Sequence, residues 1–140
     1  MTFRWEHELF APVSRFLRNR GFAQQIEEAQ FYEYHLDIFA FSRRSELSVS
    51  VELKLTKWTR AVEQALVYQL CTDLVYVAVP KATVPRVGTD LLDQHGIGLI
   101  SVEPHRCREV LKPRQSGVLR DYYRQQLVEL THHAAEIPKP

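Results

Sequence analysis

Apolar and polar residues alternate along residues 47–55, as they do in a strand that buries one face. An extended chain points four apolar side chains one way and four polar side chains the other: Val49, Val51, Leu53 and Leu55 against Ser48, Ser50, Glu52 and Lys54. Residues 31–41 alternate in the same manner, with Tyr34, Leu36, Ile38 and Ala40 facing away from Glu33, His35 and Asp37. The two segments predict neighbouring strands with an apolar core side and a polar side, joined by a polar turn at Ser42–Glu46.

Apolar residues recur at helical spacing in residues 6–20, 57–70 and 118–133, which predicts three amphipathic helices. Pro12 lies inside the first of them and indicates either a kink or a later start of that helix. Further strands are predicted at residues 22–28, 74–79 and 98–102, and a short helix around Leu91. The packing face of the last helix is expected to consist of Leu119, Tyr122, Leu127 and Leu130.

The predicted elements follow in the order α-β-β-β-α-β, with a further strand and helix as a C-terminal extension. Helices that alternate with strands in this way predict an α/β fold in which helices flank a mixed central sheet. A chain of 140 residues, 45% hydrophobic and 25% charged, has the size and composition of one globular domain. We expect this domain to span residues 1–135 and residues 136–140 to form a frayed tail.

The sequence also bounds the compartment of the protein. It contains no run of about eighteen apolar residues, so we expect no membrane span. The first ten residues are charged and lack the apolar core of a signal peptide, which favours a cytoplasmic protein. Cys71 and Cys107 have no metal-ligand spacing and are expected to be ordinary thiols.

The polar side of the predicted hairpin carries the candidate chemistry. A turn centred on Arg44–Ser45 pairs Asp37 directly with Glu52, and two carboxylates that face each other across a strand pair repel. A divalent cation such as Mg²⁺ offsets that repulsion, because it prefers carboxylate oxygens, and one of the two carboxyl groups should have a raised pKa without it. Lys54 lies on the same side, where an ammonium group can orient water or stabilise charge on a phosphate. The alternative is an ordinary surface set of salt bridges.

The wider pattern resembles the PD-(D/E)XK nuclease superfamily, especially its restriction-endonuclease-like and Holliday-junction-resolvase-like branches. The superfamily motif, an Asp on one strand and a Glu-any-Lys triplet on the next, corresponds to HLDIFAF with Asp37 and to VELK with Glu52 and Lys54. A Glu in the first helix corresponds to Glu8, with Glu6 as the alternative, and the Gln and Tyr of the following helix correspond to Gln64 and Tyr68. The resemblance covers roughly residues 4–80.

The resemblance implies a restriction-endonuclease-like αβββαβ core and a Mg²⁺- or Mn²⁺-dependent endonuclease acting on nucleic acid, DNA more than RNA. Asp37, Glu52, the backbone carbonyl of Leu53 and Glu8 would hold the metal. Lys54 and Gln64 would complete the catalytic set. The other interpretation is a catalytically inactive domain on the same fold that serves as a nucleic-acid-binding or assembly module.

Charge adds little to this picture. The net charge is +1, whereas a nucleic-acid-binding domain is usually more basic, so the position of the basic residues matters more than their number. We expect nucleic acid to contact Arg43, Arg44, Lys57, Arg60 and Tyr68. The last helix has two interpretations: its apolar stripe joins two copies into a homodimer, or it completes the core of this domain.

Overall fold

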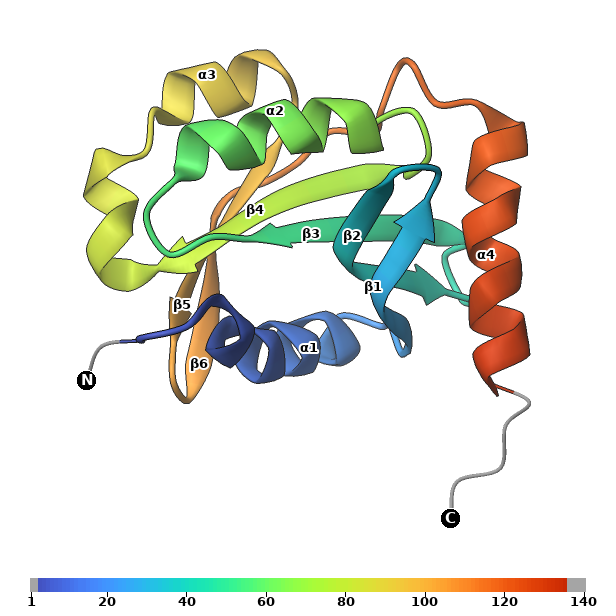
Figure 1. Ribbon diagram of the computed structural model, residues 1–140, viewed down its shortest axis with the longest axis horizontal. Helices are drawn as coiled ribbons and strands as arrows, with labels where there is room; N and C mark the ends of the chain where they lie inside the picture. The colour runs from blue at the N-terminus through green and yellow to red at the C-terminus, as the bar shows by residue number, and fades with distance from the viewer. Residues whose placement is uncertain (1–2, 136–140) are drawn as a thin grey trace.

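The structure is a computed structural model that describes residues 3–135. A six-stranded mixed sheet forms its centre, with the strands side by side in chain order, and the α/β class predicted from the sequence is confirmed (Figure 1). β1 to β3 are antiparallel, β3 to β5 are parallel, and β6 is antiparallel to β5. The elements in order are η1 (Glu6–Leu9), α1 (Phe10–Asn19), β1 (Gln24–Phe31), β2 (Tyr34–Ser42), β3 (Leu47–Leu53), α2 (Trp58–Tyr68), β4 (Leu74–Pro80), η2 (Lys81–Arg86), α3 (Thr89–Gln94), β5 (Gly98–Glu103), β6 (Arg106–Leu111) and α4 (Asp121–Ala135).

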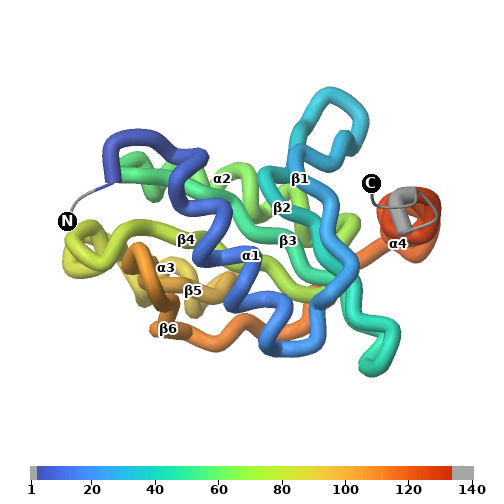
Figure 2. Tube along the Cα trace, turned by 90° about the horizontal axis from the view of Figure 1, so that it is seen from below, coloured from blue at the N-terminus to red at the C-terminus, as the bar shows by residue number. Residues whose placement is uncertain are grey.

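Helices cover both faces of the sheet. α1 lies along one face, α2 and α3 lie on the other, and α4 stands beside β1 and β2 (Figures 1 and 2). The core therefore has two parts. Leu9, Val13 and Leu17 pack with Val49, Val51 and Leu53 on the α1 side, and the α2 side buries Phe39, Phe41 and Val77 under Ala61, Ala65 and Tyr68.

This arrangement corrects the predicted polar side of the hairpin. Ser48, Ser50 and Glu52 alternate away from the α1 side as expected, but all three are buried. The reason is the β3-α2-β4 crossover, which lays α2 over that face, as parallel strand pairs require. The candidate site thus lies inside the protein instead of on an open sheet surface.

The predicted alternation in β2 is wrong at its first half. Tyr34 and Leu36 pack on the α2 side, whereas Ile38 and Ala40 pack on the α1 side. The pairing of β1 with β2 is interrupted where Glu28 would face Asp37, and Glu28 has a φ of 54°. A residue in the left-handed region changes the direction of successive side chains, so the strand pair changes face at this point.

Pro12 marks the start of the first α-helix. The predicted helix over residues 6–20 consists of η1 followed by α1, and Pro12 is the third residue of α1. The first residues of a helix have no intrahelical partner for their N–H groups, so the proline costs no hydrogen bond there. The later start indicated by the sequence is confirmed.

The packing face of α4 agrees with the predicted one at Leu127 and differs from it at Tyr122 and Leu130, and Leu119 precedes the helix. Leu127 and Val128 are buried in the core and Tyr123 packs against it, whereas Tyr122 and Leu130 are exposed. Tyr123 and Leu127 are four residues apart, and so they lie on the same side of a helix, against β1. The helix completes the core of this domain, which is one of its two interpretations.

β6 was not predicted. Its sequence, RCREVL, carries three charged residues and has no clean alternation. Charged residues are common on edge strands because they discourage pairing with another chain, and β6 is such an edge. The residues assigned to the tail, 136–140, lie outside the described part of the chain.

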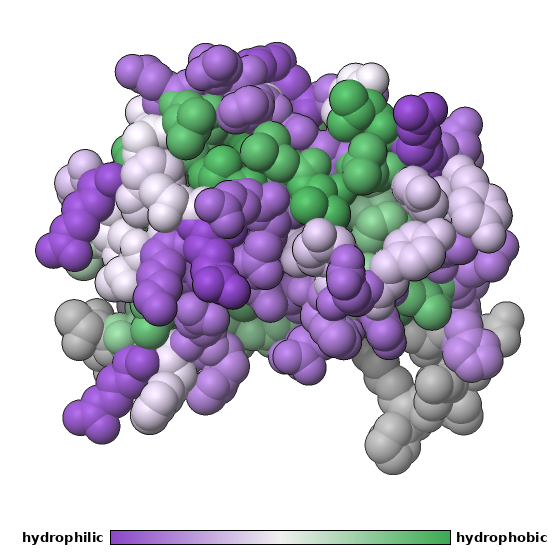
Figure 3. Space-filling view, turned by 45° about the horizontal axis from the view of Figure 1, so that its top comes forward, coloured by the Kyte–Doolittle hydropathy of each residue, from purple (hydrophilic) through white to green (hydrophobic). Residues whose placement is uncertain are grey.

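Apolar side chains also reach the surface on the side covered by α2 and α3, where Leu66 and Leu91 are among the exposed ones (Figure 3). Among the helices of residues 3–135, none combines the length and the hydropathy needed to cross a bilayer.

Asp73 joins three parts of the fold. Its Oδ2 accepts hydrogen bonds from the backbone N and the Oγ of Ser48, both at 2.7 Å, and from Nε of Arg124 at 2.8 Å. Asp73 lies in the loop between α2 and β4, Ser48 is in β3 and Arg124 is in α4. One carboxylate thus fixes the last helix to the start of the strand that carries Glu52.

We expect Asp73→Ala to lower the free energy of unfolding by about 1–3 kcal/mol, because it leaves buried donors without a partner. Urea unfolding followed by circular dichroism measures the change. Arg106→Ala is the control: its ion pair with Glu103 is exposed and contributes about 0–1 kcal/mol. Equal losses in the two variants would contradict the role given to Asp73.

Candidate functional site

The β2–β3 hairpin has the predicted register. Ile38 lies opposite Val51 and Ser42 opposite Leu47, so the next pair beyond the ladder is Asp37 and Glu52. The polar turn at residues 43–46 sets this register, and the interrupted β1–β2 pairing frees Asp37 from the regular sheet. The two carboxylates predicted to face each other are neighbours at the end of the hairpin.

Ser48, Ser50 and Glu52 form the polar face of β3, and they differ in their hydrogen-bond partners. Ser48 bonds to Asp73, and Oγ of Ser50 lies 3.2 Å from Oγ1 of Thr72. Glu52 is only 2% exposed, and its Oε2 has no hydrogen-bond partner among residues 3–135. The two serines therefore have structural partners. A buried carboxylate oxygen without a hydrogen-bond partner is costly, so Glu52 requires a partner that the described residues do not supply.

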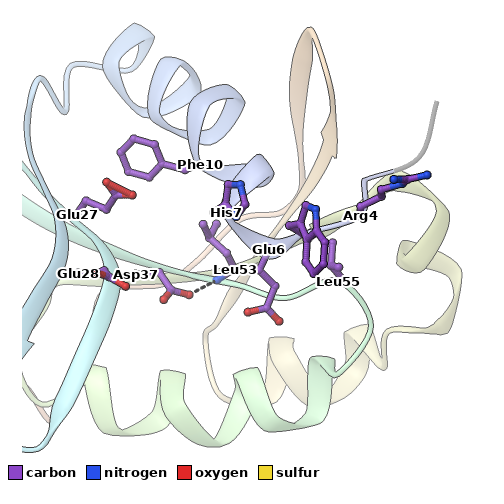
Figure 4. Close-up of a pocket in the computed structure, with 10 residues that line it drawn as sticks. Arg4, Glu6, His7, Phe10, Glu27, Glu28, Asp37, Leu53 and Leu55 are labelled. Atoms are coloured by element: carbon purple, nitrogen blue, oxygen red, sulfur yellow. Dashed lines mark hydrogen bonds between the residues drawn. The ribbon is translucent and has the colours of Figure 1, made fainter.

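Asp37 is held by the backbone of β3. Its Oδ2 accepts a hydrogen bond of 2.8 Å from the N–H of Leu53 (Figure 4). This bond orients the carboxylate, and Asp37 and Leu53 both help to line a cavity of about 490 Å³. Asp37 therefore joins the buried Glu52 to an accessible space.

Lys54 lies beside the pair, as predicted from the alternation. Its Nζ is 3.7 Å from Oε1 of Glu52 and 4.0 Å from Oε1 of Glu6. The ammonium group is mostly buried, while Glu6 is about half exposed. One cation thus stands among three carboxylates, and the cluster has a net negative charge.

Burial raises the pKa of both carboxyl groups of the pair. The pKa of Glu52 rises to about 8, first because burial disfavours the charged form and then because of the negative charge on Asp37, with Lys54 opposing both. Burial also raises the pKa of Asp37, against the hydrogen bond from Leu53. The expectation of a raised pKa at this pair is confirmed.

Glu8 does not join the cluster. Its Oε1 accepts hydrogen bonds of 2.7 Å from the backbone N–H groups of Arg4 and Trp5, and these bonds lower the pKa of Glu8. The structure does not bring Glu8 to the pair, because its carboxylate caps the start of η1. Glu6, which the motif offered as the alternative, lies with its Oε1 4.0 Å from Nζ of Lys54.

The two predicted site residues of α2, Gln64 and Tyr68, differ in whether a polar atom is left without a hydrogen-bond partner among the described residues. Tyr68 is fully buried, and its hydroxyl donates to the backbone oxygen of His35 at 3.1 Å, so the prediction that it contacts nucleic acid is wrong. Gln64 lies one turn earlier on the same helix face. Its Oε1 is buried without a partner among the described residues, and the residue lines a second cavity with Arg60 and Tyr34.

The predicted basic contacts fall in two places. Arg43 and Arg44 are exposed in the β2–β3 turn, roughly 20 Å from Asp37 at about 3.3 Å per residue. The structure does not bring them to the site, because the turn is the far end of the hairpin. Lys57 and Arg60 are exposed at the start of α2, which follows β3 directly.

The donor set suits a hard divalent cation. Oε2 of Glu52 has no hydrogen-bond partner among residues 3–135, and the carboxylate of Asp37 lies next to it. Mg²⁺ is commonly bound through one or two carboxylates while it keeps several waters. Within that part of the chain, no three His, Cys, Asp or Glu side chains gather as a metal site. A cation here would be held by the pair, a backbone carbonyl and water.

Sequence reasoning missed the wall of the cavity that the N-terminal segment forms. Arg4, Trp5, Glu6 and His7 line it, opposite Glu27 and Glu28 of β1 (Figure 4). In the sequence, this wall was indicated by the Glu-x-Glu pattern at residues 6–8. The pattern offered Glu6 and Glu8 as the acidic residue of the site and did not distinguish between them.

Comparison with solved structures finds a similar fold in a protein of unknown function from Silicibacter pomeroyi. The two structures have a TM-score of 0.73 over 96% of this chain and 90% of that chain, with 20% sequence identity. The likeness shows a common fold. No protein-family model and no curated protein sequence matches the chain.

The raised pKa of Glu52 predicts a pH-dependent stability. Between the ordinary pKa of 4.5 and about 8, the folded chain binds more protons than the unfolded chain, so stability falls as the pH rises through this window. Without divalent ions, we expect the wild type to lose up to about 1.4 kcal/mol per pH unit relative to Glu52→Gln, which cannot ionise.

Chemical denaturation at pH 5, 6.5 and 8 in the presence of a chelator measures this difference. The free energy of unfolding of Glu52→Gln should exceed that of the wild type increasingly toward pH 8. If the two pH profiles run parallel, Glu52 does not titrate as the buried pair requires.

Proposed function

We propose that this protein is a metal-dependent nuclease that hydrolyses phosphodiester bonds of nucleic acid, DNA more than RNA. The observation that carries the proposal is the Asp37–Glu52 pair with Lys54 beside it, in which a buried carboxylate oxygen of Glu52 has no hydrogen-bond partner within the described part of the chain. An ordinary surface set of salt bridges would be exposed and would leave no such atom.

The arrangement of the elements supports a restriction-endonuclease-like core. η1 and α1, the three antiparallel strands, α2 and the parallel β4 follow in the αβββαβ order of the PD-(D/E)XK superfamily. The Asp stands on the second strand and the Glu-any-Lys triplet at the end of the third, as in that motif. β5, β6 and α4 extend the core at both edges of the sheet.

Each residue of the site has a defined task in this proposal. Asp37 and Glu52, with the backbone carbonyl of Leu53, would hold Mg²⁺ or Mn²⁺, which lowers the pKa of bound water and neutralises phosphate charge. Leu53 fixes Asp37 through its N–H, so the strand itself orients the carboxylate. Lys54 holds its ammonium group 3.7 Å from Oε1 of Glu52, where it would orient the attacking water and stabilise charge that develops on the phosphate.

Gln64 and Glu6 are the outer members of the set. Gln64 offers a buried carbonyl oxygen on the helix that covers Glu52, and it would accept a hydrogen bond from water or substrate. Glu6 holds Lys54 from the solvent side at 4.0 Å. The ammonium group of Lys54 therefore lies between Glu6 and Glu52.

The inactive binding or assembly module is the second candidate. A net charge of +1 favours the inactive module, because a nuclease that binds duplex nucleic acid is usually more basic. The two candidates differ in whether the protein cleaves the nucleic acid that it binds, and a cleavage assay distinguishes them.

Lys54→Ala should lower the single-turnover cleavage rate by on the order of 10²–10³, because it removes a preorganised cation from the reacting phosphate. Affinity for nucleic acid should change much less, since one phosphate contact is a small share of the electrostatic attraction. The assay uses linear, single-stranded and branched DNA and RNA with Mn²⁺.

Lys81→Ala is the matched control, because Lys81 is an exposed lysine that pairs with Glu103 outside the cluster. It should cleave at the wild-type rate. Cleavage by Lys54→Ala at that same rate would refute the role of Lys54, and a wild type that binds but cleaves nothing would favour the binding module.

A further inference from the structure

The cavity beside Asp37 has two unlike walls. One comes from the segment that precedes α1 and presents Arg4, Trp5 and His7. The other comes from β1 and β2 and presents Glu27, Glu28 and Asp37 (Figure 4). The N-terminal wall also holds Glu6, whose carboxylate lies 4.0 Å from the ammonium group of Lys54. Because this wall carries Arg4 and the opposite wall carries carboxylates alone, a phosphate chain is repelled less along the N-terminal wall, and a bound nucleic acid would follow it.

Trp5 is the largest apolar side chain on that wall, and it is 62% exposed. The other tryptophan, Trp58, has a packing role: it is half-buried, and a Cβ added to Gly88 would lie 2.9 Å from its ring. Trp5 thus leaves its ring open to the space next to the catalytic candidates, where an aromatic face can stack on a base.

The backbone that carries Trp5 is fixed even though its ring is exposed. The N–H groups of Arg4 and Trp5 both donate to Glu8, and the N–H of Glu8 donates to the oxygen of Trp5 at 3.1 Å. Glu8 is therefore a positioning residue for this wall. A held backbone lowers the entropy lost when a ligand docks on the ring.

We infer that Trp5 is a base-stacking platform and that the substrate presents an unpaired nucleotide to the cleft. This inference rests on the proposed nuclease function and specifies its substrate. In a duplex, both faces of each base are covered by neighbouring base pairs, whereas a single strand or a branch point exposes base faces to aromatic side chains. The phosphate next to the stacked base would then lie on the Arg4 side, within reach of the Asp37–Glu52 pair.

The test uses the fluorescence of Trp5. The chain contains two tryptophans, so Trp58→Phe leaves Trp5 as the only reporter. In Trp58→Phe combined with Lys54→Ala, which slows cleavage, a single-stranded oligonucleotide with Mg²⁺ should quench the emission saturably. A blunt duplex of the same sequence should quench it much less.

Binding measured by anisotropy of a labelled single strand tests the same claim without Trp58→Phe. Trp5→Ala should weaken the affinity by on the order of 10- to 100-fold, while Trp5→Phe retains most of it. Tyr122→Ala is the control, because Tyr122 is an aromatic residue of similar exposure on α4, away from this cavity. Equal quenching by duplex and single strand, or wild-type affinity of Trp5→Ala, would overturn the inference.

The two levels of the proposal can fail separately. Stacking without any cleavage by the wild type would keep the platform and reject the nuclease. Cleavage of nucleic acid by the wild type with an unchanged KM in Trp5→Ala would keep the nuclease and reject the platform.

Discussion

The burial of Glu52 opposite Asp37 is the constraint on which the rest of the account depends. Two carboxyl groups occupy the end of one hairpin, and the sheet, α2 and the N-terminal segment enclose them. One lysine at 3.7 Å does not balance two buried negative charges. A protein relieves such a cluster by protonation, as the raised pKa of Glu52 shows, or by binding a cation. The first costs stability toward high pH, and the second would supply the chemistry of the proposed phosphodiesterase.

The surrounding fold holds this pair in place without satisfying it. Ser48 and Ser50, which share the same strand face, are matched by Asp73 and Thr72 in the loop that precedes β4. Asp37 receives one backbone N–H and retains a second oxygen. The same structure therefore contains satisfied polar groups and an unsatisfied carboxylate a few ångströms apart along one strand. Such a local departure from full satisfaction is what binding sites require, because a ligand must find groups that the protein has left free.

Most of the fold could be predicted because its elements have clear periodicity. The register that pairs Asp37 with Glu52 followed from the position of the turn and the alternation in β3. Among the features that could not be predicted, three bear on the pair and its neighbours. The crossover helix buries the polar face, which is a tertiary effect that no local pattern records. Glu28 in β1 has a left-handed conformation, and the side chains of the β1–β2 pair change face there. No glycine at this position marks the change in the sequence. The choice between Glu6 and Glu8 depended on a capping interaction with the backbone N–H groups of Arg4 and Trp5, which the residue types alone do not specify.

The central claim is that the Asp37–Glu52 pair binds a divalent cation. Calorimetric titration of Mn²⁺ into the protein tests this claim most directly, because it measures cation binding and requires no substrate. The wild type should bind Mn²⁺, and Asp37→Asn should lose that binding, since it removes a charge from the pair while keeping the shape of the side chain. Glu8→Gln should bind like the wild type, because Glu8 caps η1 and does not reach the pair. Absence of Mn²⁺ binding to the wild type, or equal binding by Asp37→Asn, would contradict the account.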